Sequence, residues 1–354
     1  MASNEQLNIP ISRQPQQTSA AAEQSFPARF IDCMNAYRQG AALKAAIELD
    51  LFTVLSEGGQ TAESLALRLQ ASTRGVRILC DYLTIKGYLL KEGGRYSVTQ
   101  DAAMFLNRKS PTYLGSAVLF LGDPELMENF RNLAGCVRKG GTVNAKGTLI
   151  PENPVWVKFA RSMAPIAAMD AELVAQLLGK DSTRKCKVLD IAAGHGMYGI
   201  ALGRHNPNAE IVALDWKNVL AVARENAGNA GVSGRYNVIE GSAFEVDFGD
   251  GYDIVLLTGF LHHFSKEMNE ALLHKVHRAL QPGGRAVVLE FVPNDDRLSP
   301  RIPAEFSLTM LASTPEGDAY TFSELERMFR NAGFRSAELY DIPPSPQRVV
   351  IGST

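Results

Sequence analysis

Two aspartates bracket a glycine-rich turn in the second half of the chain. Val188–Ile191 is a short apolar run that contains Asp190, the turn after it carries Gly194 and Gly196, and Asp215 closes the next apolar run. Glycines at such a turn let the backbone come close to a ligand, and an acid at the end of the second strand can accept hydrogen bonds from both hydroxyls of a ribose. This stretch therefore predicts a strand–helix–strand unit that binds a nucleoside.

The position of Asp190 indicates which kind of nucleoside compound the turn accepts. Asp190 lies four residues before Gly194, and Gly199 completes a G-x-G-x-x-G pattern. A carboxylate at the mouth of the turn repels a pyrophosphate and attracts a ligand that carries an ammonium group. The pattern therefore argues against a nicotinamide dinucleotide and for a cationic nucleoside.

A pair of histidines follows another apolar run. His262 and His263 come shortly after Tyr252–Leu257, which is the predicted central strand. Ligands of open α/β sheets bind at the carboxyl ends of the strands, and a histidine there can act as a general base near neutral pH. Because consecutive residues of a strand point to opposite sides, we expect only one of the two to face a substrate. A purely structural role for both remains an alternative.

These motifs stand in the order typical of one enzyme class. The chain resembles the class I S-adenosylmethionine-dependent methyltransferases, whose first motif is D-x-G-x-G-x-G or close to it, although Ala192 stands where a glycine is common. The turn Pro282-Gly283-Gly284 before the apolar run Ala286–Phe291 is also typical of the class. Over roughly residues 155–350 the resemblance implies a Rossmann-like α/β sheet, mostly parallel with an antiparallel last strand.

The resemblance implies S-adenosyl-L-methionine as the cofactor and S-adenosyl-L-homocysteine as the product. It assigns Asp215 to the ribose and Trp216 to stacking on the adenine, whereas Ser242 stands where the family often has an aspartate that contacts the adenine. His195, inside the glycine turn, is expected to pack over the cofactor. The implied cofactor-binding residues are Asp190, Gly194, Gly196, Asp215, Trp216, Ser242, Ala243 and Phe244.

Within this class the chain is most similar to the small-molecule O-methyltransferases of plants and bacteria. Their His-Asp-Trp motif reads His262-His263-Phe264 here, so His262 matches the base that deprotonates the substrate hydroxyl, and Glu290 matches the acid that orients it. A second acid of the plant enzymes falls at Ala319, so that part of the pattern is missing. The alternatives are a C- or N-methyltransferase and a non-catalytic regulatory protein that binds the cofactor. His263 also remains a candidate for the base.

Apolar side chains are expected to form the wall of the substrate pocket. A helix that begins at Pro154 and the segment before the loop 314–318 supply them, and an ordinary core is the alternative for the first group. The predicted pocket residues are Trp156, Phe159, Met163, Phe306 and Met310. Their character predicts a small aromatic or otherwise apolar acceptor, and no metal site is expected.

The chain divides into four predicted segments. They are a disordered tail (1–24), a winged-helix dimerisation domain (26–107), bridging helices that line the substrate pocket (108–180) and the cofactor-binding catalytic domain (181–354). In the second segment a helix over Phe26–Arg38 is expected to end at Gly40, and in the third a single helix is expected from Asp123 to about Arg138. The family resemblance implies a homodimer built through the second segment.

Composition and charge exclude several classes of partner. Nine Lys/Arg and eight Asp/Glu in residues 27–105 are too balanced for DNA binding, and the whole chain of 354 residues has a net charge of −2. No apolar run approaches the ~18 residues that span a bilayer, and the N-terminus lacks the pattern of a secretion signal. The four cysteines include no C-x-x-C pair. We therefore expect a cytoplasmic enzyme of secondary metabolism that binds neither nucleic acid nor membrane.

Overall fold

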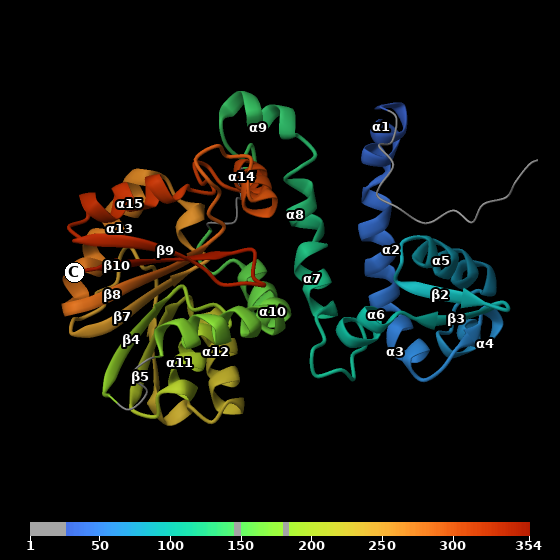
Figure 1. Ribbon diagram of the computed structural model, residues 1–354, viewed down its shortest axis with the longest axis horizontal. Helices are drawn as coiled ribbons and strands as arrows, with labels where there is room; N and C mark the ends of the chain where they lie inside the picture. The colour runs from blue at the N-terminus through green and yellow to red at the C-terminus, as the bar shows by residue number, and fades with distance from the viewer. Residues whose placement is uncertain (1–25, 145–149, 180–183) are drawn as a thin grey trace, which may run out of the picture.

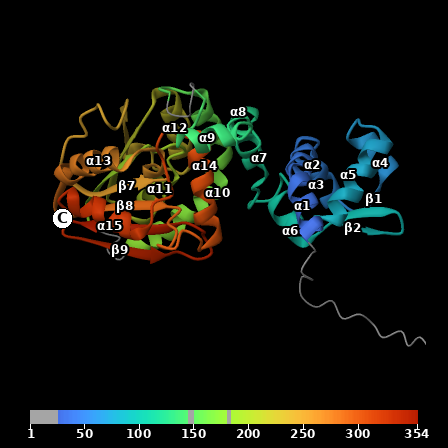
Figure 2. The same ribbon diagram turned by 90° about the horizontal axis from the view of Figure 1, so that it is seen from above.

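The structure has two lobes joined by short helices (Figures 1 and 2). This computed structural model describes residues 26–144, 150–179 and 184–354. The larger lobe is a sheet between two layers of helices, and the smaller lobe contains the N-terminal helices with a small sheet of their own. The predicted tail, residues 1–24, lies outside the described residues. None of the described helices combines the length and apolar composition that a membrane crossing requires.

The sheet of the larger lobe has seven strands in the order β6-β5-β4-β7-β8-β10-β9. The strands are β4 (Cys186–Ile191), β5 (Ala209–Asp215), β6 (Tyr236–Glu240), β7 (Tyr252–Thr258), β8 (Leu280–Glu290), β9 (Ser336–Asp341) and β10 (Arg348–Ser353). The pairs from β6 through β8 are parallel, whereas β10 is antiparallel to both β8 and β9. The predicted Rossmann-like sheet with an antiparallel last strand is confirmed.

Helices cover both faces of this sheet, which is why its central strands are continuous apolar runs. On one face lie α10 (Pro154–Leu178), α11 (Met197–His205) and α12 (Lys217–Asn229); on the other lie α13 (Lys266–Ala279) and α15 (Phe322–Asn331). Val188 packs into the first core and Leu189 into the second, because neighbouring residues of β4 face opposite sides of the sheet. A capping box begins α15, in which the Thr321 side chain accepts from the backbone N–H of Glu324 and the Glu324 side chain accepts from that of Thr321.

The strand order changes direction between β4 and β7, and this switch point places the site. Connections from strands on either side of such a point leave the sheet in opposite directions and open a crevice at the carboxyl ends. The loops after β4, β5, β7 and β8 meet at that edge. All of the predicted catalytic residues and most of the predicted cofactor contacts lie in these loops or at these strand ends.

The smaller lobe is built from six helices and three short strands among its described residues. They are α1 (Phe26–Asn35), α2 (Tyr37–Glu48), α3 (Leu51–Ser56), α4 (Ala62–Arg68), α5 (Thr73–Ile85), α6 (Gln100–Phe105), β1 (Gln60–Thr61), β2 (Leu89–Glu92) and β3 (Arg95–Val98). The predicted hairpin is β2–β3, and β1 adds a strand beside β3. The predicted helix end at Gly40 is wrong. The helix is interrupted at Ala36, between α1 and α2, and α2 continues through Gly40. One glycine costs a helix interior only ~1 kcal/mol.

Short helices connect the two lobes. They are the 3-10 turn η1 (Gly115–Ala117), α7 (Val118–Leu121), α8 (Pro124–Glu128) and α9 (Leu133–Lys139). The single helix predicted from Asp123 to Arg138 is wrong. The side chain of Asn132 accepts a hydrogen bond from the backbone N–H of Gly135 at 3.1 Å and so caps a new helix.

Two glycines give a matched test of packing in the larger lobe. A Cβ at Gly352 on β10 would lie 2.4 Å from the ring of Phe329, whereas one at Gly228 in α12 would meet nothing within 4 Å. We expect Gly352→Ala to lower the free energy of unfolding by about 1–3 kcal/mol through overpacking. Gly228→Ala should leave it equal or higher, since alanine favours the helix. Chemical denaturation checks both, and equal effects of the two changes would contradict the packing described here.

Candidate active site

The glycine turn between β4 and α11 has a backbone conformation that residues with a side chain rarely adopt. Gly194 and Gly196 have φ angles of +58° and +74°, and a Cβ at Gly196 would lie 2.4 Å from the hydroxyl of Tyr236. Ala192 also has a positive φ of 53°. The turn therefore keeps its backbone exposed to a ligand at the start of α11, as the sequence predicts.

Asp215 ends β5 and is tied to this turn. Its carboxylate accepts hydrogen bonds from the backbone N–H of Gly194 at 2.8 Å and of Trp216 at 2.7 Å. A carboxylate offers about four lone-pair positions, so acceptor capacity remains for two hydroxyl donors. Burial raises the pKa of Asp215 to about 6.

Asp190 lies beneath the turn and is fully buried. One carboxylate oxygen accepts a hydrogen bond from Gly199 N–H at 3.1 Å, and the other has no partner among the described residues. A Cβ at Gly199 would lie 2.9 Å from the first oxygen, so the close approach of Asp190 requires a glycine at this third position of the G-x-G-x-x-G pattern. Burial raises the pKa of Asp190 to about 7, and the nearby Asp215 adds to the rise. A buried acid with a free oxygen suits a cationic ligand.

His262 and Glu290 form a buried pair at the ends of β7 and β8. His262 Nδ1 lies 2.6 Å from Glu290 Oε2. The other oxygen, Oε1, accepts hydrogen bonds from the backbone N–H of Phe260 at 2.9 Å and of His262 at 3.3 Å. A carboxylate partner keeps the proton on Nδ1, so Nε2 is the nitrogen able to accept a proton.

His263 is placed differently from its neighbour. Both histidines lie in the 3-10 turn η3 (Leu261–His263), and their ring centroids are 4.2 Å apart. The prediction that they point to opposite sides is therefore wrong, because strand alternation ends at β7. His263 packs edge-on against Trp156 at 5.3 Å, and burial, with a smaller effect of His262, holds the pKa of His263 well below its usual value. His263 is therefore neutral near pH 7, and the carboxylate pairs with His262.

Aromatic side chains surround the histidine turn. Phe306 on α14 (Arg301–Ser313) packs edge-on against His262 at 4.9 Å. Trp156 and Phe159 on α10 contact each other at 6.0 Å, and Phe159 stacks on His195 at 5.8 Å. These three predicted wall residues are thus brought together near the site. Of the other two predicted wall residues, Met310 is buried on α14 and Met163 is half-buried on α10.

The segment after β6 lies beside the same turn. The ring of Phe244 packs on Phe264 at 4.8 Å and on Phe260 at 6.3 Å. The hydroxyl of Ser242 accepts a hydrogen bond from Phe244 N–H at 3.3 Å, and Ala243 is buried. The predicted adenine wall is therefore continuous with the histidine turn. Trp216, after β5, and Trp156, near the start of α10, are partly buried and pack against the same small cluster of Ala160, Val219 and Val222.

Several residues of the site carry no local signal in the sequence. Asn226 on α12 donates to the carbonyl of His195 at 2.9 Å, and Lys275 on α13 donates to the carbonyl of Ala243 at 3.0 Å. The hydroxyl of Tyr236 is buried beside Gly196 with no partner among the described residues. The two hydrogen bonds join residues 31 and 32 positions apart in the sequence, so these contacts become visible only in the folded structure.

Two loops close over the histidine turn. A Cβ at Gly317 would lie 2.2 Å from the carbonyl oxygen of His262, and one at Gly141 would lie 2.0 Å from that of Pro315. Thr142 N–H donates to the carbonyl of Thr314 at 2.8 Å. The loop that carries Gly317 therefore touches the histidine turn directly, and the loop that carries Gly141 packs on the first loop backbone to backbone.

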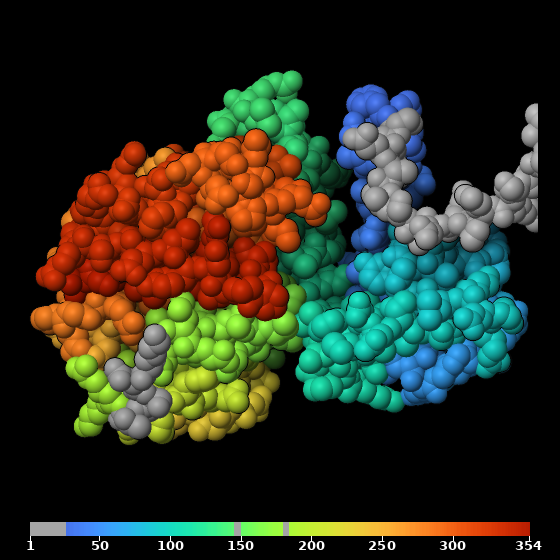
Figure 3. Space-filling model, in the orientation of Figure 1, coloured from blue at the N-terminus to red at the C-terminus, as the bar shows by residue number. Residues whose placement is uncertain are grey.

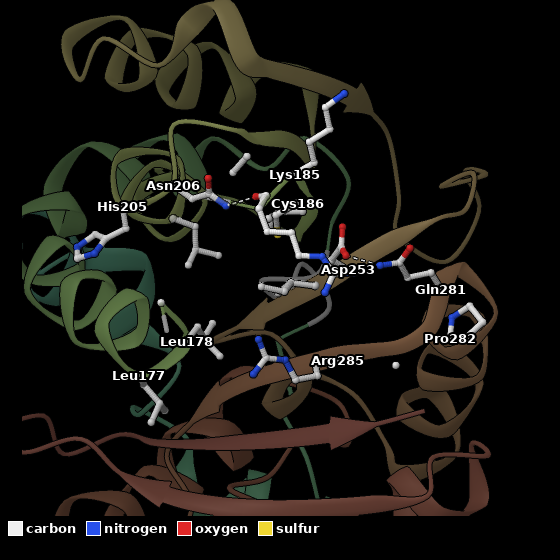
Figure 4. Close-up of a pocket in the computed structure, with 17 residues that line it drawn as sticks. Leu177, Leu178, Lys185, Cys186, His205, Asn206, Asp253, Gln281, Pro282 and Arg285 are labelled. Carbon is white, nitrogen blue, oxygen red and sulfur yellow. Dashed lines mark hydrogen bonds between the residues drawn. The ribbon is translucent and has the colours of Figure 1, made fainter. Parts of the chain in front are cut away.

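A cavity of about 430 Å³ opens at the opposite, amino-terminal edge of the sheet (Figure 4). Leu178 and His205, from the C-terminal ends of α10 and α11, line it together with Arg285 and Asp253. This cavity is remote from Asp215 and His262 and is not the predicted site.

Comparison with known proteins assigns the family. A model described as the O-methyltransferase domain matches residues 150–335, and one described as the O-methyltransferase dimerisation domain matches residues 31–108. The chain belongs to the O-methyltransferase family. It is an S-adenosylmethionine-dependent methyltransferase, and the alternative of a non-catalytic regulatory protein is not favoured.

Relatives match nearly the whole chain. A Nostoc punctiforme protein, solved as a candidate O-methyltransferase, is 49% identical, with 94% of this chain and 100% of that chain covered and a TM-score of 0.90. The 3-hydroxy-5-methyl-1-naphthoate 3-O-methyltransferase of Streptomyces sahachiroi is 27% identical over 87% of this chain and 89% of its own. The methyl transferase PigF of a Serratia strain is 26% identical over 91% and 94%. A PigF structure with S-adenosylhomocysteine has a TM-score of 0.80 at 25% identity, covering 92% of this chain and 99% of that chain.

The residues of the glycine turn fit S-adenosylmethionine. The free buried oxygen of Asp190 offers an acceptor to a cationic group, and Asp215 has lone pairs left for the ribose hydroxyls. The side-chain-free positions of Gly194 and Gly196 leave the backbone open on the ligand side. The individual contacts remain predictions, which the following experiment tests.

Cofactor affinity should depend on pH through these two acids. With pKa values of about 7 for Asp190 and about 6 for Asp215, both become neutral as the pH falls, and a neutral acid is a weaker acceptor. We expect S-adenosylmethionine affinity to decrease as the pH drops through these values. Asp215→Asn should weaken binding by about 1–3 kcal/mol above that range and lose the lower of the two steps.

Isothermal titration calorimetry at several pH values measures this affinity. Glu210→Gln is the control, because Glu210 lies exposed on the same strand, β5, and should bind as the wild type does. Wild-type affinity of Asp215→Asn across the pH range would contradict the assignment of Asp215 to the ribose.

Proposed function

We propose that the enzyme methylates a hydroxyl oxygen of a small aromatic acceptor, with His262 as the general base. The observation that carries the proposal is the buried pair of His262 and Glu290, whose Nδ1 and Oε2 atoms are 2.6 Å apart at the carboxyl edge of the sheet. The family description as an O-methyltransferase domain favours oxygen over the nitrogen and carbon alternatives.

The residues of the site have complementary tasks in this proposal. When bound, S-adenosylmethionine supplies a methyl group activated by a positively charged sulfur. His262 Nε2 takes the proton of the acceptor hydroxyl as that oxygen attacks, and Glu290 stabilises the imidazolium through Nδ1. A positioned base contributes about 10²–10⁴-fold. Holding the reacting atoms in line supplies up to roughly 7–11 kcal/mol, so placement outweighs proton transfer.

The walls of the site support an aromatic acceptor. Phe306 packs on His262, and Trp156 packs on His263, so flat apolar surfaces flank the proposed base. The Streptomyces sahachiroi relative is named for a hydroxynaphthoate, which is a compound of this kind. Ala319 is buried at the position where the resemblance places a second acid, so His262 relies on Glu290 alone. An acceptor with a fairly acidic hydroxyl, such as a phenol, suits that arrangement.

A screen of phenols, hydroxynaphthoates, indoles and quinols with S-adenosylmethionine tests the function. Mass spectrometry should show the gain of one CH₂ in at least one phenolic compound, and its fragmentation should place the methyl group on oxygen. Methyl transfer confined to indole nitrogen or ring carbon would contradict the proposal.

The surface of the N-terminal lobe supports a homodimer. Helix α1 buries none of its residues, and Phe26, Phe30 and Met34 on it are 72%, 55% and 61% exposed. Figure 3 shows a notch in the surface between α1 and the helices α8 and α9. Met127 on α8 and Phe130 just after α8 are also exposed. Exposed apolar surface of this extent marks an interface. We assign it to a second copy, in line with the dimerisation-domain match.

The proposed setting is cytoplasmic secondary metabolism. All four cysteines are free, which fits a reducing compartment. The relative that methylates a naphthoate supports a role on a specialised small molecule.

The two histidines should respond differently to substitution. His262→Ala should lower kcat by about 10²–10⁴-fold and leave cofactor affinity unchanged, because the lost interaction exists only in the transition state. His263→Ala should cost much less. At saturating S-adenosylmethionine, where the pH-dependent affinity set by Asp190 and Asp215 has no effect, the pH profile of kcat should lose its acidic limb in the first variant only. The reverse pattern would make His263 the base, and wild-type kcat in both variants would leave catalysis to placement alone.

The dimer should depend on α1. Light scattering at micromolar concentration should give twice the chain mass, and an obligate interface of this type buries more than ~2,000 Å² in total. The double variant Phe30→Glu and Met34→Glu should yield monomers, because charges replace apolar contacts. Leu298→Glu is the control, since Leu298 is 80% exposed and lies outside α1, in the loop before α14. A monomeric wild type would contradict the assignment.

A further inference from the structure

A buried asparagine forms hydrogen bonds with the turn that carries the two histidines. Asn269 lies in the first turns of α13 and is 0% exposed. Its Nδ2 donates hydrogen bonds to the carbonyl of Leu261 at 2.9 Å and to that of Phe264 at 3.4 Å. These carbonyls belong to the residues immediately before and after the His262–His263 pair. One amide group therefore bridges both ends of the turn.

Asn269 and Glu290 hold opposite polar groups of the same turn. Glu290 accepts from the N–H groups of Phe260 and His262, whereas Asn269 donates to carbonyls. The hydroxyl of Tyr320 also donates to the carbonyl of Phe264. The imidazole of His262 has Glu290 as its only hydrogen-bond partner among the described residues. The height and tilt of its free Nε2 therefore follow the backbone of the turn, which Asn269 helps to fix.

The amide of Asn269 is poorly explained as a device for stability. Its Oδ1 is buried without a hydrogen-bond partner among the described residues. A buried unsatisfied acceptor costs free energy, and a leucine of similar volume would avoid that cost. The two carbonyls would each keep one donor, since Phe264 N–H donates to the carbonyl of Leu261 at 3.2 Å and the hydroxyl of Tyr320 donates to that of Phe264. Residues that break a local rule of this kind tend to be found where function needs them.

We propose that Asn269 is a positioning residue for the general base. It holds the turn so that His262 Nε2 meets the acceptor hydroxyl while the methyl group lies in line behind it. This inference rests on the proposed function of His262. Asn269 itself touches neither the acceptor nor the cofactor in this proposal, so its loss should affect turnover rather than binding.

The first test replaces the amide by an isosteric apolar group. Asn269→Leu should lower kcat about 10- to 100-fold, because a misplacement of about 1 Å can cost ~10²-fold. The KM for the phenolic acceptor found in the screen and the Kd for S-adenosylmethionine should stay within about twofold of wild type. Should this variant fail to fold, Asn269→Ser replaces it, since a hydroxyl on one carbon is too short to span both carbonyls.

Val276→Ala controls for a general weakening of the helix. Val276 is fully buried on α13, two turns beyond Asn269, and its apolar side chain donates no hydrogen bond to the turn. It should lower the melting temperature and leave kcat unchanged at a temperature where the protein is folded. A kcat loss in this variant equal to that of Asn269→Leu would overturn the positioning role, because disturbing α13 anywhere would then suffice.

A double-mutant cycle shows whether Asn269 acts through His262. In the His262→Ala background, adding Asn269→Leu should reduce kcat no further, since there is no imidazole left to position. An equal fold-loss in both backgrounds would overturn the proposal. So would a wild-type kcat in Asn269→Leu beside an impaired His262→Ala variant. An unimpaired His262→Ala variant, in contrast, would overturn the base assignment itself.

Discussion

The carboxylate of Glu290 is shared by one imidazole and two backbone N–H groups, all at the end of β8 and out of contact with bulk water. A buried carboxylate must have its acceptor positions filled, and here the donors come from one short segment, Phe260–His262. That segment therefore folds into a tight 3-10 turn at the end of β7. The aromatic side chains of Phe244, Phe264 and Phe306 pack around this turn. The catalytic edge of the sheet is thus organised by the need to satisfy one acid.

The sequence could be read correctly where neighbours along the chain decide the structure. The run from Val188 to Asp215 has the spacing of a strand, a turn and a strand, and the structure reproduces it as β4, the glycine turn with α11, and β5. The pairing of His262 with Glu290 was also predictable, from the family pattern. Its physical basis is the parallel register of β7 and β8, in which Thr258 lies opposite Leu289. Because the two strands end at the same level, the residues that follow them, His262 after β7 and Glu290 at the end of β8, lie close enough to form a hydrogen bond.

Long-range contacts could not be read in this way. Asn269, Asn226 and Tyr236 act on the site through hydrogen bonds or close approaches that exist only after the helices pack on the sheet. An asparagine inside a helix normally indicates an exposed or capping position, and nothing in the sequence shows that Asn269 is fully buried. The incorrect helix boundaries have a related cause, since a single side-chain cap at Asn132 outweighs helix propensity. The opposite orientation expected for His262 and His263 failed because the strand ends before them.

The interlocked loops above the histidine turn carry a consequence for how this enzyme can change over time. Gly141 and Gly317 leave no room for side chains, so the contacts at these two points join main chain to main chain. Mutation cannot alter main-chain groups, and any larger residue at these two points forces the loops apart. Evolutionary change toward a new acceptor is therefore expected at the predicted pocket wall, where Trp156, Phe159 and Phe306 present side chains rather than main chain.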